Sequence, residues 1–215
     1  MPMKLDKREY RNINATEMET RLVQDGQMIV EGYAATFNQP YQLMKDKNIT
    51  VNEQIDRNAF VETDMSDVIM QYDHEGRVFA RIANGTLQLA MDDHGLKIRA
   101  NLGGTEIGRQ LFEEIQGGYT NKMSFGFTVA GEKRERMKDA EGRITVLRTI
   151  TKVGKLFDVS AVSLPANDAT EISSRTISDG LIAEAMEEIR AEEERQRKIG
   201  EIRKILGKDT ENHDD

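Results

Sequence analysis

Alternating apolar and polar positions dominate the first two-thirds of the chain and predict short β-strands. Residues 28–37 (MIVEGYAATF) form a predicted strand that ends at the turn residues NQP. Residues 86–91 (TLQLAM) and 96–100 (LKIRA) alternate on both sides of the turn residues DDHG, which predicts a β-hairpin. Further strands are predicted at 68–72, 123–130, 144–151 and 156–164, with a polar loop at 131–142.

Two segments have helical periodicity instead. In residues 105–116 (TEIGRQLFEEIQ) apolar side chains recur every four positions, at Ile107, Leu111 and Ile115. Thr105 is the predicted N-cap of this helix, and a pair of glycines ends it. Residues 178–206 are rich in Glu, Arg, Lys and Ile and carry two apolar stripes, which predicts a charged amphipathic helix with a break near Gly200.

This order of elements predicts a mainly β fold with helices, of the α+β class. We expect a β-rich domain over residues 1–170 and a charged helical extension over residues 171–215. A chain of 215 residues is long enough to bury a core without disulfides or metals. No apolar stretch approaches the roughly 20 residues of a membrane span, and the N-terminus lacks the apolar core of a signal peptide. We therefore expect neither membrane insertion nor export by a signal peptide.

Charge and cysteine content narrow the chemistry further. The net charge is −8, which is the wrong sign for a general nucleic-acid binder. The chain has no cysteine, so thiolate nucleophiles, Cys-ligated zinc and disulfides are all excluded. This composition is typical of a reducing cytoplasm. The glycine pairs lack the spacing of a phosphate-binding loop. We expect no nucleic-acid partner.

The most informative short run is residues 123–127 (MSFGF), where one serine lies inside an apolar segment directly after a polar loop. The strand-like residues around Ser124 indicate a rigidly held hydroxyl. A buried hydroxyl bonded to the backbone is the alternative, and it is the more common state of an isolated strand serine. A serine nucleophile also needs an adjacent base, because its free hydroxyl is a weak nucleophile at neutral pH.

Three histidines are available as that base. His213 lies in the C-terminal tail, and His94 lies in the predicted hairpin turn, where an exposed polar residue needs no function. His74 follows an apolar strand in a polar loop, and its alternative is an ordinary surface histidine. By elimination, any chemistry that depends on histidine points to His74.

A third group should orient the imidazole and stabilise its charged form. Asp158 lies between Phe157 and Val159 in an apolar strand, and carboxylates are rarely buried without a partner. The alternative is that Asp158 points to solvent from the polar face of the strand. Asp73 is a weaker candidate, since neighbours on an extended chain face opposite ways and Asp73 is adjacent to His74.

A metal site is the main chemical rival. The pair His74-Glu75 and the run Asp92-Asp93-His94 contain ligand types for zinc or manganese. No His-x-x-x-His or equivalent helical spacing supports this site, and two distant loops would have to meet. We therefore expect no metal and no other cofactor.

An ordered set of motifs resembles the HK97-family phage prohead proteases, which are capsid-maturation serine proteases. The motifs are GYA at 32–34, DH at 73–74, NGTLQL at 84–89, MSFGF at 123–127 and DVS at 158–160. The chain departs from the family at 56–58 (DRN), where Pro-Gly is expected, and at Asn167, where an aromatic residue is usual. Neither departure touches the candidate catalytic residues.

The resemblance implies a small β-barrel similar to the herpesvirus assembly protease fold, surrounded by helices. It also implies Ser124 as nucleophile, His74 as general base and Asp158 as the third catalytic residue. The implied activity is cleavage of the major capsid protein or its scaffold segment inside the prohead, in the cytoplasm of the bacterial host. The alternative is a non-catalytic capsid-assembly module with the same fold.

The resemblance raises three further expectations. The charged C-terminal helix either binds scaffold or capsid protein or is a surface helix without a partner. The chain is expected to cleave itself in the exposed region after Thr170. By analogy with the herpesvirus enzymes, a homodimer is expected to control activity.

Overall fold

The computed structural model describes residues 8–13, 18–22, 27–45, 48–163 and 194–202, together with positions 180, 183, 186–187 and 190–191. The chain divides into two units, Met1–Arg175 and Thr176–Asp215. The predicted domain boundary between residues 170 and 171 lies outside the described residues. No helix among the described residues is long and apolar enough to cross a membrane.

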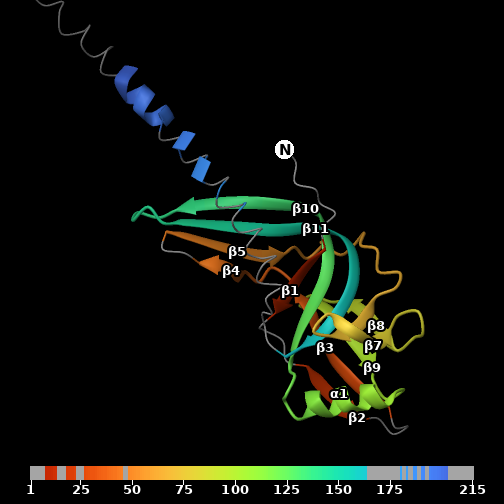
Figure 1. The fold of residues 1–215 in the computed structure, drawn as a ribbon. Helices are drawn as coiled ribbons and strands as arrows, with labels where there is room; N and C mark the ends of the chain where they lie inside the picture. Colours follow the sequence, from red (N-terminus) through yellow and green to blue (C-terminus); the bar gives the residue numbers. More distant parts are fainter. Residues whose placement is uncertain are drawn as a thin grey trace, which may run out of the picture. The chain divides into compact units, whose positions relative to one another are not determined.

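Seven strands of the first unit form its larger sheet (Figure 1). Five of them lie in the order β1 (Glu9–Ile13), β10 (Lys122–Lys138), β11 (Ile144–Val162), β5 (Ile49–Ile55) and β4 (Tyr41–Lys45). The other two are β6 (Ile69–Tyr72), which pairs with the last part of β11, and β7 (Glu75–Arg81), which pairs with β6. β5 pairs with the first part of β11, so β11 has a different neighbour at each end.

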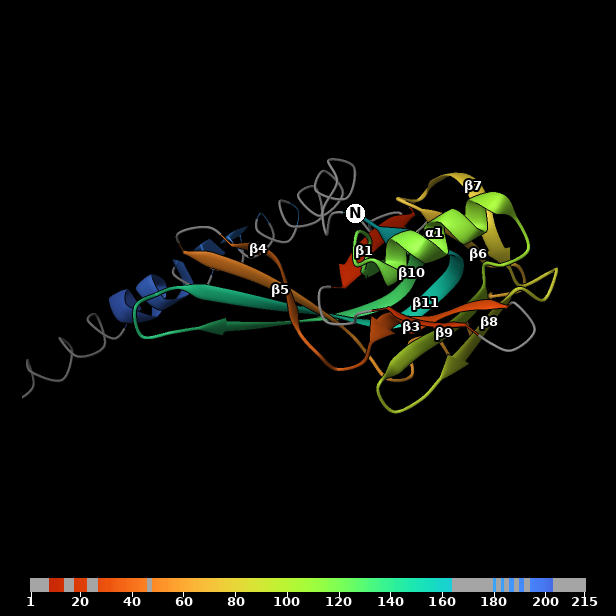
Figure 2. The same ribbon diagram turned by 90° about the horizontal axis from the view of Figure 1, so that it is seen from below.

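The antiparallel hairpin of β10 and β11 is bent in its middle. Its register shifts at several points between Gly126 and Glu132, as at β-bulges, which bend a strand and increase its twist. Beyond the bend, residues 129–138 and 144–153 run with β4 and β5 away from the rest of the unit, and we call this four-stranded part the arm (Figures 1 and 2).

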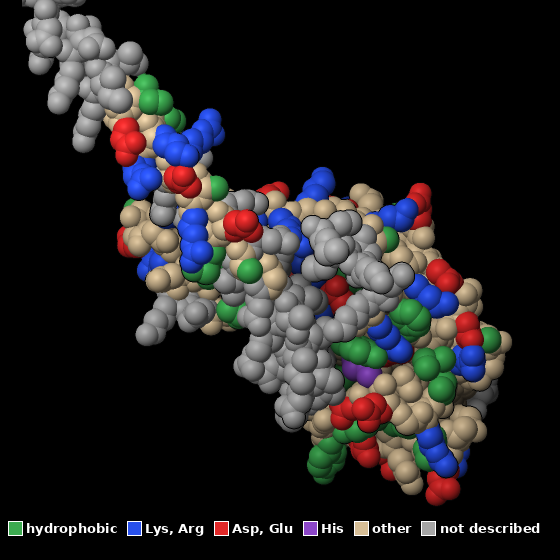
Figure 3. Space-filling model, turned by 45° about the horizontal axis from the view of Figure 1, so that its top comes forward, with side chains coloured by type: hydrophobic (Ala, Val, Ile, Leu, Met, Phe, Trp, Pro, Cys, Tyr) green, Lys and Arg blue, Asp and Glu red, His purple; other side chains and the backbone are tan. Residues whose placement is uncertain are grey.

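The arm corrects the predicted polar loop at 131–142. The strand continues to Lys138, and only the residues between Asp139 and Arg143 turn. The loop prediction was wrong because charge pairs replace apolar alternation here: Glu132 accepts hydrogen bonds from Arg134 and Arg148, each at 2.6 Å. Acidic and basic side chains lie interspersed on the face drawn in Figure 3. The two strands predicted at 144–151 and 156–164 are one continuous strand, β11.

The second sheet has four strands in the order β2 (Glu19–Leu22), β3 (Met28–Thr36), β9 (Gly95–Asn101) and β8 (Leu87–Met91). The predicted hairpin is confirmed as β8 and β9. Its turn is held by the Asp92 carboxylate, which accepts the backbone N–H groups of His94 and Gly95 at 2.8 and 3.0 Å. A Cβ at Gly95 would lie 2.0 Å from the carbonyl oxygen of Ala35, so this close approach of backbones requires glycine.

The predicted helix is confirmed as α1 (Glu106–Gln116). The hydroxyl of Thr105 accepts the N–H of Gly108 at 3.1 Å, which makes Thr105 the N-cap. α1 buries Leu111, Phe112 and Ile115 in the core that it shares with both sheets. These contacts fix α1 against β2, β3 and β7, and Figure 1 labels α1 next to β2.

The α+β class is confirmed, but the described strands do not close into the predicted small barrel. They form two separate sheets that share one apolar core. A chain of phenylalanine rings crosses this core: the centroid of Phe60 is 6.1 Å from that of Phe37 and 6.2 Å from that of Phe125. Closure fails because half of the long hairpin leaves the core to form the arm, and its outer partners β4 and β5 go with it.

In the second unit, the described residues have helical backbone. Lys198 pairs with Glu194, one turn earlier, at 2.8 Å. The helix continues through Gly200, where the sequence pattern predicted a break. A continuous amphipathic helix over 178–206 stays a prediction, because much of that range lies outside the described residues.

Candidate active site

Ser124 lies on β10 between two neighbouring strands. It is opposite Asn12 of β1 and opposite Ser160 of β11. Directly paired residues of antiparallel strands point to the same face, so the side chains of Ser124 and Ser160 emerge together. Ser124 is fully buried, and its Oγ donates a hydrogen bond to the carbonyl oxygen of Arg11 at 2.9 Å.

His74 is presented by a tight turn between β6 and β7. Tyr72 pairs with Glu75, and the two turn residues have positive φ angles, 47° at Asp73 and 61° at His74. Left-handed backbone is unfavourable for residues other than glycine, and such strain is concentrated at functional sites. The turn brings His74 Nε2 to 2.6 Å from Ser124 Oγ.

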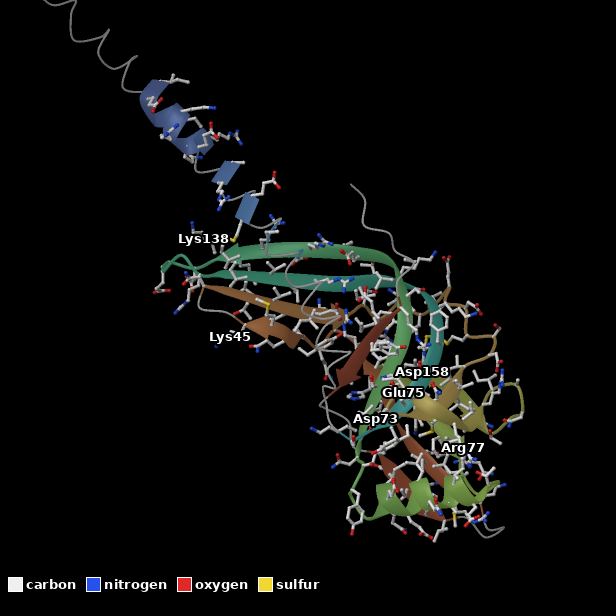
Figure 4. The ribbon with its side chains drawn as sticks, in the orientation of Figure 1. Lys45, Asp73, Glu75, Arg77, Lys138 and Asp158 are labelled. Atoms are coloured by element: carbon white, nitrogen blue, oxygen red, sulfur yellow. The ribbon has the colours of Figure 1, made fainter. Side chains whose placement is uncertain are left out.

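Asp158 completes the group from β11. Its Oδ1 is 2.6 Å from His74 Nδ1 and accepts the hydroxyl of Ser160 at 2.7 Å, and its Oδ2 is bound by the guanidinium of Arg8. Gly126 leaves room for this carboxylate, because a Cβ there would lie 2.3 Å from Oδ2. Figure 4 labels Asp158 beside Asp73 and Glu75 of the β6–β7 turn, at the end of the hairpin opposite to Lys138.

Electrostatics favour the ionised form of Asp158. Burial by itself would raise the pKa of this carboxyl, but the hydrogen bond and charge of His74 lower it, and the Ser160 hydroxyl and the Arg8 guanidinium lower it further. The resulting pKa is below the ordinary value. An ionised carboxylate at Nδ1 holds the imidazole with its other nitrogen toward Ser124. The arrangement can therefore move a proton between Ser124 and His74.

The other sequence candidates lie elsewhere. Asp73 accepts the N–H and hydroxyl of Ser163 at 3.1 and 2.9 Å. His94 lies exposed in the β8–β9 turn with its ring 4.5 Å from that of Tyr33. Within the described part of the chain, no group of three or more His, Cys, Asp or Glu side chains could hold a metal ion.

The sequence did not reveal two side chains that bind Asp158, namely those of Ser160 and Arg8. Ser160 could have been found, since it is two positions after Asp158 on one strand and so faces the same way. Arg8 gives no such signal, because 150 residues separate it from Asp158.

The family model described as "Caudovirus prohead serine protease" matches residues 15–184. Among solved structures, the bacteriophage T4 capsid assembly protease gp21 is similar with a TM-score of 0.37 and 12% identity. That match covers 72% of this chain and 98% of the T4 protein. No curated protein sequence matches.

Proposed function

Because the chain belongs to the caudovirus prohead serine protease family, we propose that it is a serine endopeptidase of capsid maturation. The observation that carries the proposal is the unbroken row of hydrogen bonds from Asp158 through His74 to Ser124, with both distances at 2.6 Å. These are the residue types and the mutual geometry of a Ser-His-Asp triad.

In the proposed reaction, His74 Nε2 accepts the proton of Ser124 as its Oγ attacks the carbonyl carbon of the scissile peptide bond. The imidazolium then gives this proton to the leaving amine, which frees the amine from the acyl-enzyme. Water enters and is deprotonated by His74, and its attack on the ester restores Ser124. Throughout, Asp158 accepts the Nδ1–H of His74 and stabilises the imidazolium.

The proposed substrates are the major capsid protein or its scaffold segment, enclosed in the immature phage shell in the host cytoplasm. Cleavage of an assembly segment makes maturation irreversible, since a hydrolysed peptide bond does not re-form inside the shell. Cleavage of the chain itself after Thr170, binding of scaffold by the charged C-terminal segment and control by homodimerisation are further parts of this proposal. They concern regions or partners outside the described residues.

Co-expression with the capsid protein of the same phage tests the proposal. We expect Ser124→Ala and His74→Ala to abolish capsid-protein cleavage, measured by mass spectrometry of purified particles. Ser163→Ala is the matched control, because its hydroxyl is exposed and bonds only to Asp73 among the described contacts. Normal processing with Ser124→Ala would remove the nucleophile and leave the non-catalytic assembly module as the better function.

That alternative has one observation in its favour: Ser124 has no exposed surface. A nucleophile that no substrate can reach does not cleave anything. The identity of the segment that covers Ser124 therefore bears directly on the proposed function.

A further inference from the structure

β1, an edge strand of the larger sheet, lies directly beside Ser124. It pairs antiparallel with β10 from Glu9 opposite Phe127 to Ile13 opposite Met123. Extended peptides commonly bind proteins by adding a strand to such a sheet edge. β1 therefore holds the edge of β10 that an extended substrate would need in order to bring a carbonyl group to Ser124.

β1 and Arg8, the residue before it, contact all three proposed catalytic residues. Arg8 binds the carboxylate of Asp158, and the carbonyl of Arg11 accepts the hydroxyl of Ser124 at 2.9 Å. The ring of Tyr10 lies 4.4 Å from the imidazole of His74, between centroids. The guanidinium of Arg8 also covers the Tyr10 ring at 4.9 Å, which ties these contacts together.

The Arg11 carbonyl competes with His74 for the serine proton. The Ser124 hydroxyl has one proton and two acceptors within reach. Its Oγ donates to the Arg11 carbonyl oxygen at 2.9 Å and lies 2.6 Å from His74 Nε2. A hydroxyl that donates to the carbonyl of β1 does not donate to the general base, so β1 opposes the first step of the reaction.

On the face of β1 opposite to Tyr10, charged side chains bind this strand to its neighbours. Arg11 donates to Glu53 from Nε at 2.5 Å and from Nη2 at 3.1 Å. Glu9 accepts from Arg148 at 3.0 Å, and Arg11 and Glu9 also bind each other. Both Arg11 and Arg148 are almost completely buried. These ion pairs are shielded from water, so β1 is held in one register on β10.

The family match does not include β1. It begins at residue 15, two residues after the end of β1, and contains Ser124, His74 and Asp158. The proposed catalytic residues thus belong to the part that the family shares, and the strand beside Ser124 precedes it.

We propose that β1 is an inhibitory strand that occupies the peptide-binding edge of β10, and that an extended substrate segment replaces it before cleavage. This inference rests on the proposed protease function and adds its regulation. It also accounts for a hydrogen-bonded triad whose nucleophile is buried, since β1 pairs with the strand that carries Ser124 and binds its hydroxyl.

A reversible disulfide between β1 and β10 tests the inference. Because the chain has no cysteine, an introduced pair has no other cysteine in the chain to react with. Ile13 and Met123 are register partners on β1 and β10. In the double variant Ile13→Cys/Met123→Cys, oxidation ties β1 to β10, and dithiothreitol releases it. We expect the oxidised protein to cleave capsid protein at least tenfold more slowly than the same protein after reduction. The single-cysteine variants should not respond to the oxidant.

Equal rates in the oxidised and reduced forms, with the disulfide verified by mass, would overturn the inference. They would leave the proposed function intact, since its own test is loss of cleavage with Ser124→Ala. If the double variant does not fold, a second measurement decides. We expect Arg8→Ala to speed the labelling of Ser124 by a fluorophosphonate at least threefold over wild type. An unchanged or slower rate means that Arg8 and β1 support the active site and do not block it.

Discussion

Substitution of Glu53, whose carboxylate is buried, tests most directly how the buried ion pairs between β1 and its neighbours stabilise the fold. Glu53 has no exposed surface and accepts hydrogen bonds from Arg11, from Arg148 at 2.6 Å and from the Tyr41 hydroxyl at 2.5 Å. The substitution Glu53→Gln keeps the size of the side chain and removes its charge. Two buried guanidinium groups then lose the carboxylate that they share.

The pKa of Glu53 gives the magnitude. Burial would raise this pKa, but the charges of Arg11 and Arg148 and the hydrogen bonds from Arg11 and Tyr41 lower it from 4.5 to about 2. At about 1.4 kcal/mol for each tenfold change in the protonation equilibrium, this lowering corresponds to about 3 kcal/mol of folding free energy at pH 7. Removal of one partner from a buried ion pair typically costs about 3–5 kcal/mol, which agrees with this value.

The direction of the pH dependence follows from the lowered pKa. The unfolded chain protonates Glu53 near its ordinary pKa of 4.5, and the folded protein does so only near 2. The stabilisation by this carboxylate is therefore complete above about pH 5, and most of it is lost as the pH falls to 2. We expect the wild type to lose this contribution in that interval, and Glu53→Gln to lack it at every pH.

Urea unfolding followed by far-UV circular dichroism at pH 7 and at pH 3 measures both effects. Glu62→Gln is the control, since that carboxylate is 71% exposed and pairs with Lys152 on the surface, where a salt bridge contributes little. We expect no measurable change for the control. A loss below about 1 kcal/mol for Glu53→Gln at pH 7, or a variant whose acid sensitivity equals that of wild type, would refute the reasoning.

Three further variants probe the site and the helix. Gly126→Ala places a Cβ 2.3 Å from Asp158 Oδ2, so we expect at least a tenfold fall in kcat/KM for capsid-protein cleavage. Gly104→Ala is the control, because a Cβ there faces open space and should leave kcat/KM unchanged. Ser160→Ala removes a hydroxyl that donates to the buried Asp158 carboxylate, and urea unfolding should show a loss of about 1.5–3 kcal/mol. Thr105→Ala removes the N-cap of α1 and should cost about 1 kcal/mol in the same assay.

Sequence patterns predicted the elements whose signals are local. The hairpin of β8 and β9 has apolar residues in alternation on both strands. The Asp and Gly residues of its turn lie within five residues of each strand. α1 carries its cap, its apolar stripe and its terminating glycines within 14 residues, from Thr105 to Gly118. In both cases the residues that decide the structure are neighbours in sequence, so the packing of the rest of the chain does not change the outcome.

β1 and the arm were not predictable in this way. The sequence of β1, EYRNI, contains two charged side chains that read as exposed, yet Glu9 and Arg11 are buried because Glu53 and Arg148 face them. Charged residues become acceptable inside a protein only when partners complete the pairing. Those partners lie 42 and 139 residues away, so no window of sequence around β1 contains the reason for its burial.

The geometry of the candidate triad is also not predictable from local sequence. Residue types, elimination and the family resemblance nominated Ser124, His74 and Asp158, but their meeting depends on the register of β11 with two strands at once. Ser160 of β11 is opposite Ser124 on one side and opposite Gln71 of β6 on the other, so the turn after β6 reaches across to Ser124. A slip of β11 by one residue would turn the Asp158 side chain to the opposite face of the sheet. The candidate site is therefore a property of the pairing of three strands, and any change that shifts β11 against β10 or β6 should disable it without touching a proposed catalytic residue.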